Sequence, residues 1–282
     1  MKGLLLIFAR RYIAGSHRED AIRAALSLNR SNIKATIDNL GENVRTEGQA
    51  QSSVVEYLSL LDDIKSSGAD SQVSLKLTHM GLGISRALAK ENVERVIKKA
   101  LEQGNFVRFD MEGSAYTQAT IDIFLELRKK YPNIGIAMQS ALKRSMVDAK
   151  AISEARGSIR LVKGAYKEPP SIAFQEKKEV DRSYEEIMKG LLVSGTRPAI
   201  ATHDIRFIDE AKRFAAERGI SKDSFDFEML LGIKRTMQRT LADEGYTMRV
   251  YVPYGKDWLP YTLRRLRERK ENIWFVVKNI FD

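Results

Sequence analysis

The chain has 282 residues, with 47 Lys and Arg against 37 Asp and Glu, so its formal net charge is +10. It has no cysteine and three histidines, which excludes disulfides, thiolate metal sites and a cysteine nucleophile. With no cysteine and only three histidines, the chain offers few of the usual ligands for a zinc or iron site. Basic and acidic residues are interspersed and no RNA-binding or helix-turn-helix signature is present, so we expect no nucleic-acid partner. The positive charge instead fits an anionic substrate, an anionic cofactor or an anionic membrane surface.

No stretch of the sequence approaches the roughly 20 apolar residues of a membrane span. The short apolar run at 3–9 ends at two arginines, so it is interpreted as the first turns of a packed helix and not as a secretory signal. A second apolar run, at 273–281, could touch a membrane surface, or pack on the protein itself or on another subunit. We expect a cytoplasmic protein, and peripheral contact with the inner face of the cell membrane stays open.

Strand and helix patterns alternate along the chain. Residues 1–31 are predicted to be helical, because 18–29 place apolar and charged residues at helical spacing. Eight strands are predicted, within 32–39 and at 73–77, 106–110, 135–139, 158–163, 198–202, 225–230 and 248–252. Helices are predicted between them at 47–66, 91–103, 119–130, 145–154, 181–194, 205–218 and 234–244, and a last helix opens near Pro260.

The spacing of the strands, roughly 25 to 40 residues, is typical of βα units. Eight such units predict an α/β protein, a (βα)8 TIM barrel with extra N-terminal helices. The alternative is a doubly wound open sheet, but no G-x-G-x-x-G follows a predicted strand. The expected organisation is a helical segment at 1–31, one catalytic barrel at 32–270 and a tail at 271–282.

Polar residues gather at the predicted strand ends, where the active sites of TIM barrels lie. They are Lys76, Asp110, Gln139, Arg160, Lys163, Thr202, His203, Glu228 and Tyr251. Either a polar ligand satisfies them, or Lys76 and Asp110 simply pair with each other inside the barrel mouth. No P-loop, G-x-S-x-G or H-E-x-x-H motif occurs, so the pocket suits a cofactor that carries the chemistry while the protein positions the substrate.

The last predicted helix carries a second candidate site. Tyr261, Arg264, Arg265 and Glu268 follow one another at i, i+3, i+4 and i+7, so they share one helical face. Two guanidinium groups present donor pairs that match a carboxylate, and Glu268 could hold one of them in place. The alternative is that this arginine pair belongs to an ordinary solvated face.

Several motifs together resemble the proline dehydrogenase family, in particular its short monofunctional bacterial and archaeal members. They occur in the expected order from about Thr36 to Glu268. They are ATIDNLGE at 35–42, LVKGAYK at 161–167, ATHD at 201–204, FEMLLG at 227–232, VYVPYG at 250–255 and the Tyr-Arg-Arg-Glu set just described.

The resemblance implies an FAD-binding, distorted (βα)8 barrel whose last helix lies over the barrel mouth. It implies oxidation of L-proline to Δ1-pyrroline-5-carboxylate, the first step of proline catabolism, by hydride transfer from C5 to the flavin N5. Electrons would pass to a quinone in the membrane. The product would go to a separate pyrroline-5-carboxylate dehydrogenase, since the chain lacks the aldehyde dehydrogenase domain of multifunctional relatives.

The resemblance also implies roles for individual residues. Lys76, Asp110, Arg160 and Tyr251 would be catalytic, with Arg160 near the reactive flavin nitrogen, and no metal is implied. Arg264, Arg265 and Lys76 would bind the proline carboxylate, and Asp110 and Glu268 would orient these cations. Tyr251, Tyr261 and Leu230 would enclose the proline ring. The residues that would contact FAD are Gln139, Arg160, Val162, Lys163, Gly164, Ala165, Thr202 and His203.

Two departures and two alternatives accompany this interpretation. Lys167 stands where some multifunctional relatives carry tryptophan, and the loop between Tyr251 and Arg264 is shorter than theirs.

Methylenetetrahydrofolate reductase, a related FAD barrel, is the alternative enzyme, although it needs no carboxylate clamp on the last helix. A basic module that binds nucleic acid or membrane is the alternative from another class. Hydroxyproline oxidation is a close variant, which Tyr261 is expected to disfavour by crowding a 4-hydroxyl group.

Overall fold

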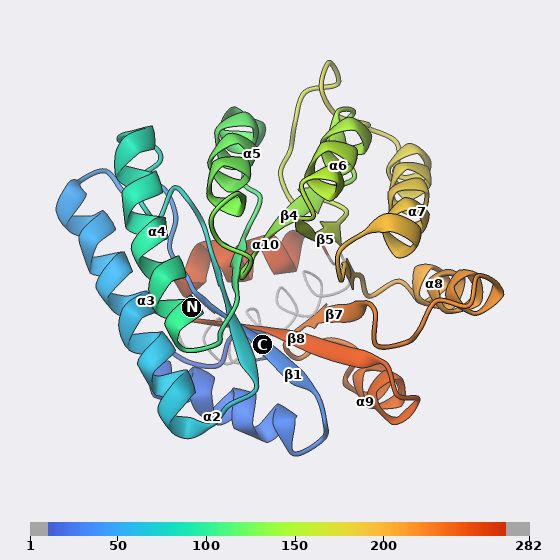
Figure 1. Ribbon diagram of the computed structural model, residues 1–282, viewed down its shortest axis with the longest axis horizontal. Helices are drawn as coiled ribbons and strands as arrows, with labels where there is room; N and C mark the ends of the chain where they lie inside the picture. Colours follow the sequence, from blue (N-terminus) through green and yellow to red (C-terminus); the bar gives the residue numbers. More distant parts are fainter. Residues whose placement is uncertain (1–10, 269–282) are drawn as a thin grey trace, which may run out of the picture.

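The computed structural model describes residues 11–268, with side chains as far as residue 263. Eight parallel strands form a closed barrel in chain order, and β8 pairs with β1 (Figure 1). This confirms the predicted TIM barrel and excludes the open doubly wound sheet. The strands are β1 (Lys34–Asn39), β2 (Ser71–Leu75), β3 (Val107–Phe109), β4 (Ile134–Gln139), β5 (Ser158–Val162), β6 (Ala199–Ala201), β7 (Asp226–Leu230) and β8 (Thr247–Tyr254).

Seven helices that follow the strands surround the barrel. They are α3 (Glu47–Ser67), α4 (Arg86–Glu102), α5 (Ser114–Arg128), α6 (Ser145–Glu154), α7 (Lys177–Ser194), α8 (Ile205–Glu217) and α9 (Arg235–Asp243). In the described part of the chain, none of the helices combines the length and the apolar character that crossing a bilayer requires.

The place of an eighth outer helix is taken by α2 (Arg18–Asn29), which comes before the barrel in the sequence. It buries Ala21, Ile22 and Ala25 and packs against β1, β8 and α3. Figure 1 shows it between α3 and α9. The helix that follows β8, α10 (Trp258–Glu268), lies inside this ring of helices in the same view. Its Tyr261 lines the cavity at the strand ends, which agrees with the expected last helix over the barrel mouth.

The residues before α2 secure α10 in this place. Tyr12 and Ile13 form a small apolar cluster with Leu40, Ile233 and Tyr261, separate from the main core. The backbone N–H of Ala14 donates to the carbonyl of Pro253 (2.8 Å), and that of Gly255 donates to the carbonyl of Gly15 (3.0 Å). The N-terminal segment therefore contacts the mouth, whereas α2 itself lines the outer wall.

The strands alternate between an apolar outer face and a polar inner face, as side chains of a strand point to opposite sides. Leu75, Phe109 and Phe227 pack outward in the core beneath the helices. Polar pairs fill the lower interior, where TIM barrels usually hold branched apolar side chains. These pairs are Arg249–Asp226 (Nε–Oδ2 3.2 Å), Arg108–Ser158 (Nη2–Oγ 3.2 Å) and Gln72–Thr36 (Nε2–Oγ1 3.0 Å).

Glycine at position 135 is part of this polar packing. A Cβ atom at Gly135 would lie 2.8 Å from Nη1 of Arg108 and 2.9 Å from the ring of Phe106. The buried guanidinium of Arg108 therefore occupies the volume that a side chain on the neighbouring strand would need.

The predicted end of the last strand was wrong. The prediction stopped at Val252 because of Pro253 and Gly255, but β8 continues through Pro253 to Tyr254. The carbonyl of Tyr251 accepts from the N–H of Leu231, just after β7, so Tyr251 and Pro253, two residues later, both turn their backbone polar groups toward β7. The pairing of β7 with β8 ends at Tyr251. A residue at position 253 therefore has no partner on β7 to donate to, and proline, which has no N–H, breaks no hydrogen bond of the sheet there.

Other element boundaries moved by a few residues. The helix predicted from Glu91 begins at Arg86, since the Ser85 hydroxyl accepts a hydrogen bond from the N–H of Leu88 and caps it. The strand predicted to end at Leu77 ends at Leu75. Lys76 therefore follows its strand directly, which places it at the mouth and not in the ladder.

Candidate active site

The carboxyl ends of the strands surround a cavity of about 490 Å3. Every predicted site residue whose side chain is described lines it, so the structure brings together residues that are far apart in the sequence. They are Lys76, Asp110, Gln139, Arg160, Val162, Lys163, Gly164, Ala165, Thr202, His203, Leu230, Tyr251 and Tyr261. The side chains of Arg264, Arg265 and Glu268 lie outside the described residues, so the clamp stays a prediction.

Asp110 is the centre of the charged network in this cavity. Its Oδ1 lies 2.8 Å from Nη1 of Arg160 and accepts from the Ser74 hydroxyl at 2.6 Å. Its Oδ2 accepts from Tyr251 at 2.7 Å and lies 3.3 Å from Nζ of Lys76. Burial of this carboxylate opposes ionisation, but the two cations and the hydrogen bonds outweigh it and lower the pKa of Asp110. Asp110 is therefore ionised at neutral pH.

Lys76 is held between two carboxylates, so the predicted pairing with Asp110 is observed. Its Nζ lies 3.0 Å from Oδ2 of Asp38 as well as 3.3 Å from Asp110. Burial alone would lower the pKa of Lys76, but Asp38 and Asp110 reverse this and raise it above its ordinary value. Lys76 stays protonated and still lines the cavity, so the ion pairs do not prevent it from contacting a ligand.

Asp38 was missed as a functional residue by sequence reasoning. It is fully buried on β1, and its Oδ1 accepts from the hydroxyl of Tyr57 at 3.3 Å. Burial raises the pKa of Asp38; Lys76 opposes the shift and the charge of Asp110 adds to it. The signal that could have found it is its position near the end of β1, level with Ser74 on β2 and so just below Lys76.

Arg160 connects the network to β7. Its Nε lies 2.7 Å from Oε2 of Glu228, and its guanidinium lies over the ring of Tyr251, 5.3 Å from the centroid. Among the described residues, Nη2 of Arg160 and Oε1 of Glu228 are buried without a hydrogen-bond partner. Buried polar groups in this condition are costly, so a ligand that supplies an acceptor to Arg160 and a donor to Glu228 would be stabilised here.

The wall of the cavity on the β4–β5 side depends on glycine at position 164. Gly164 has a φ of +117°, and a Cβ there would lie 3.0 Å from Oε1 of Gln139. Gln139 cannot easily move away, because its Nε2 donates to the carbonyl of Glu112 at 2.8 Å. This position therefore excludes other residues on both conformational and steric grounds.

The β6 side of the cavity is also held by specific contacts. Nε2 of His203 accepts from the backbone N–H of Leu230 at 2.9 Å, which fixes the orientation of the ring. Nζ of Lys163 lies 2.6 Å from Asp181 and 3.5 Å from Asp204, so its position is set by two carboxylates from neighbouring helices and loops.

Other residues of the cavity were given no role by the family resemblance. The sequence could have indicated two of them. Glu228 is a polar residue in the alternating pattern of its strand, and Tyr166 lies within the LVKGAYK motif. Lys167, the departure noted above, is not part of the lining. The additional lining residues are Met111, Ala137, Tyr166, Ala201, Asp204, Glu228 and Met229.

Comparison with known proteins identifies the family of this chain. A proline dehydrogenase family model matches residues 21–278. Proline dehydrogenase 2 of Bacillus subtilis (strain 168) is 39% identical over 274 residues, which cover 97% of this chain and 90% of the relative. Proline dehydrogenase of Deinococcus radiodurans is 38% identical over 277 residues, covering 96% of this chain and 89% of the relative.

Solved structures show the same likeness. Proline utilization A (PutA) from Bdellovibrio bacteriovorus, crystallised after inactivation by N-propargylglycine, matches with a TM-score of 0.86 and 27% identity. The match covers 93% of this chain and 32% of that one, so this chain spans about a third of that PutA. With the family model matched over most of its length, the chain belongs to the proline dehydrogenase family.

Proposed function

We propose that this protein oxidises L-proline to Δ1-pyrroline-5-carboxylate with FAD as cofactor. The observation that carries the proposal is that one cavity at the strand ends collects the described residues expected for both cofactor and substrate in a member of this family. A closed barrel with its functional residues at the carboxyl ends of the strands is the usual arrangement of an enzyme of this fold.

The cavity suits a flavin on two observations. Nη2 of Arg160 is buried without a partner among the described residues and can donate to a ring acceptor. Gly164 leaves room for a flat ring to approach the backbone. We assign FAD binding to Gln139, Arg160, Val162, Lys163, Gly164, Ala165, Thr202 and His203. Bound FAD would supply the hydride acceptor, and Arg160, which is always protonated, would place a positive charge beside it.

The charge balance of the network explains why the substrate needs further cations. The described side chains around Asp110 comprise the cations Lys76 and Arg160 and the carboxylates Asp38, Asp110 and Glu228. Both cations are already paired with these carboxylates, so little of their charge is left for an anionic substrate. We therefore assign the binding of the proline carboxylate to Arg264 and Arg265 together with Lys76.

The backbone of α10 supports this assignment. The helix continues through Glu268, and Tyr261 lines the cavity. Positions 264, 265 and 268 follow Tyr261 at i+3, i+4 and i+7, so they fall on the same helical face. Tyr251, Tyr261 and Leu230 would enclose the ring, where each buried methylene contributes about 0.8 kcal/mol.

The amine of proline must lose a proton before or during hydride transfer. Lys76 is protonated and the lowered pKa of Asp110 makes it a weak base, so neither is suited to hold that proton. We propose that the deprotonated substrate is the reactive form and that the rate rises with pH. Electrons would then pass to a membrane quinone, with peripheral contact at the membrane, and a separate pyrroline-5-carboxylate dehydrogenase would consume the product.

The decisive experiment is the visible spectrum of the purified protein before and after anaerobic addition of L-proline. We expect the absorbance of oxidised flavin to disappear with proline and to persist with NADH. Bleaching by NADH but not by proline would favour a methylenetetrahydrofolate reductase activity. A protein that neither contains nor takes up FAD would contradict the proposal.

A further inference from the structure

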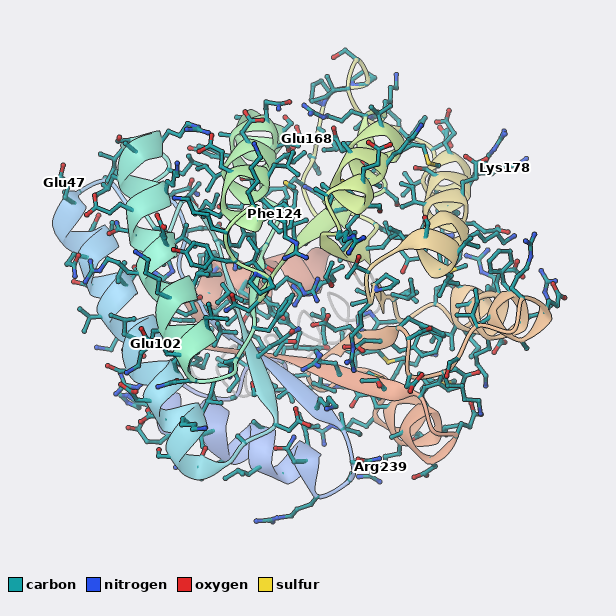
Figure 2. All side chains as sticks on the ribbon, viewed as in Figure 1. Glu47, Glu102, Phe124, Glu168, Lys178 and Arg239 are labelled. Atoms are coloured by element: carbon teal, nitrogen blue, oxygen red, sulfur yellow. The ribbon has the colours of Figure 1, made fainter. Side chains whose placement is uncertain are left out.

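The connection between β5 and α7, residues 163–176, reaches from the cavity to another part of the barrel. Its first residues, including Ala165 and Tyr166, line the cavity. A little further along, Glu168 contacts the beginning of α5, far away in the sequence. Figure 2 labels Glu168 in this connection beside α5.

Helix α5 begins without a capping side chain of its own. Its N-cap residue is Gly113, which makes no side-chain cap. The first N–H groups of a helix need acceptors, and they favour negative charge. Glu168 supplies both: its Oε1 accepts from the backbone N–H of Ser114 at 2.7 Å, and its Oε2 accepts from the Ser114 hydroxyl at 2.5 Å.

The two ends of the connection are attached elsewhere. The N–H of Ala141 donates to the carbonyl of Lys163 (2.9 Å), and the N–H of Phe174 donates to the carbonyl of Ala141 (2.9 Å). Lys143 bonds to Ile172 through its backbone and to Pro170 through its side chain. These bonds join the ends to the residues after β4, whereas Glu168 joins the middle to α5.

The side chain of Tyr166 lies next to the N-terminus of α5, where Glu168 caps the helix. A Cβ atom at Gly113 would lie 3.9 Å from Cδ1 of Tyr166 and 3.7 Å from Oε1 of Glu168. Both side chains therefore lie beside the N-cap residue of α5. Tyr166, after β5, and Lys76, after β2, line the same cavity from different parts of the mouth.

We propose that Glu168 is a positioning residue for substrate binding: by capping α5 it holds Tyr166 in the wall of the cavity. The inference rests on the proposed oxidation of proline. It goes beyond that proposal because Glu168 touches neither the cavity nor the charged network. The new claim is that the hydrogen bonds of the α5 cap contribute to the affinity for the substrate.

The test compares the proline kinetics of Glu168→Ala, Glu168→Gln and Ser114→Ala with those of the wild type. We expect Glu168→Ala to raise the KM for proline about fivefold and to change kcat less than twofold, with smaller increases in the other two. In a Tyr166→Ala background, Glu168→Ala should raise KM no further, since the residue to be positioned is absent. An additive rise in that background, or an unchanged KM in all three variants, would overturn the inference.

A matched control lies on the same connection. Glu176 is the N-cap residue of α7, and its backbone N–H donates to Oε2 of Glu179 at 3.4 Å. Glu176→Ala removes a carboxylate of the same connection that is not attached to α5, so it should leave KM unchanged. A rise in KM equal to that of Glu168→Ala would mean that general loosening of the connection, and not Tyr166, is responsible.

Amide hydrogen exchange supplies a readout that does not depend on activity. The Ser114 N–H should exchange faster in Glu168→Ala than in the wild type, whereas α7 should be unaffected. Unchanged exchange at Ser114 would contradict the cap itself. A wild-type protein that does not oxidise proline would contradict the proposed function, and the exchange result would still decide whether Glu168 orders α5.

Discussion

The hydroxyl of Tyr251 donates a 2.7 Å hydrogen bond to Oδ2 of Asp110, which joins the last strand of the barrel to the third. The other oxygen of Asp110 contacts Arg160, whose guanidinium lies over the Tyr251 ring. The aromatic wall of the cavity and its charge balance are therefore parts of one network.

Tyr251→Phe tests this connection. A hydrogen bond to a charged group contributes about 1.5 to 3 kcal/mol, so we expect kcat/KM for proline to fall about tenfold or more. Tyr131→Phe is a matched control, because its hydroxyl also donates at 2.7 Å to a carboxylate, that of Glu94, outside the cavity. Steady-state kinetics of both variants measure the difference, and equal losses would contradict a specific role for Tyr251.

Arg264→Ala and Arg265→Ala test the predicted clamp. Each should raise the KM for proline by about tenfold or more, the loss expected for a charge-assisted contact, with flavin content intact. Arg182→Ala is the control, since Arg182 is an exposed helical arginine whose Nε lies 2.8 Å from Glu186. Unchanged proline kinetics in both clamp variants would show that the arginine pair belongs to a solvated face.

Gly164→Ala tests the wall of the cavity on the β4–β5 side. The added methyl group would meet Gln139 at 3.0 Å in a backbone conformation unfavourable for alanine, so we expect the ratio of flavin absorbance to protein absorbance to fall. Gly104→Ala separates strain from crowding, because Gly104 also has a positive φ (+69°) but no atom within 4 Å of the added carbon. It should lower stability by about 1 kcal/mol and leave flavin content unchanged. Full flavin content in Gly164→Ala would remove this wall from the proposed site.

His79 makes stability depend on pH. Burial, and then the positive charge of Lys76, lower the pKa of His79 to about 4. Between about pH 6.5 and 4, the unfolded chain binds a proton at this residue that the folded chain does not. The free energy of unfolding therefore falls as pH falls through this window, by at most about 3 kcal/mol.

Denaturant unfolding at several pH values measures this effect. His79→Gln should show a smaller loss of stability than the wild type between pH 6.5 and 5, above the range where most carboxylates titrate. His17→Gln, at an exposed histidine, is the control for removal of a histidine outside this buried position. The same slope in His79→Gln as in the wild type would mean that the ring is not the titrating group.

Local sequence patterns predicted the barrel because its order follows the chain. Each strand pairs with its neighbour in sequence, so strand spacing alone indicates the architecture. Polar strand ends then predicted the lining of the cavity, since the carboxyl ends of parallel strands meet at one face. Lys76 was predicted to lie within its strand and in fact follows it, but both positions are at the mouth of the barrel.

Two features could not be predicted because they depend on contacts between distant residues. Asp38 gained its role from Lys76, which directly follows β2 and approaches Asp38 only when β1 and β2 pair. The capping of α5 by Glu168 likewise joins residues separated by 54 positions. Helical periodicity showed that 18–29 would be helical, but not that this helix would fill a gap in the outer ring.

The exchange of places between α2 and α10 separates two tasks, which are to complete the outer wall of the barrel and to line its cavity. A segment ahead of the barrel completes its outer wall, so the helix after β8 contributes a side chain to the cavity and is not needed to enclose the strands. Changes on α10 can thus alter which small molecule is accepted while the scaffold keeps its integrity, and this makes α10 the natural place for evolution or engineering to retune selectivity.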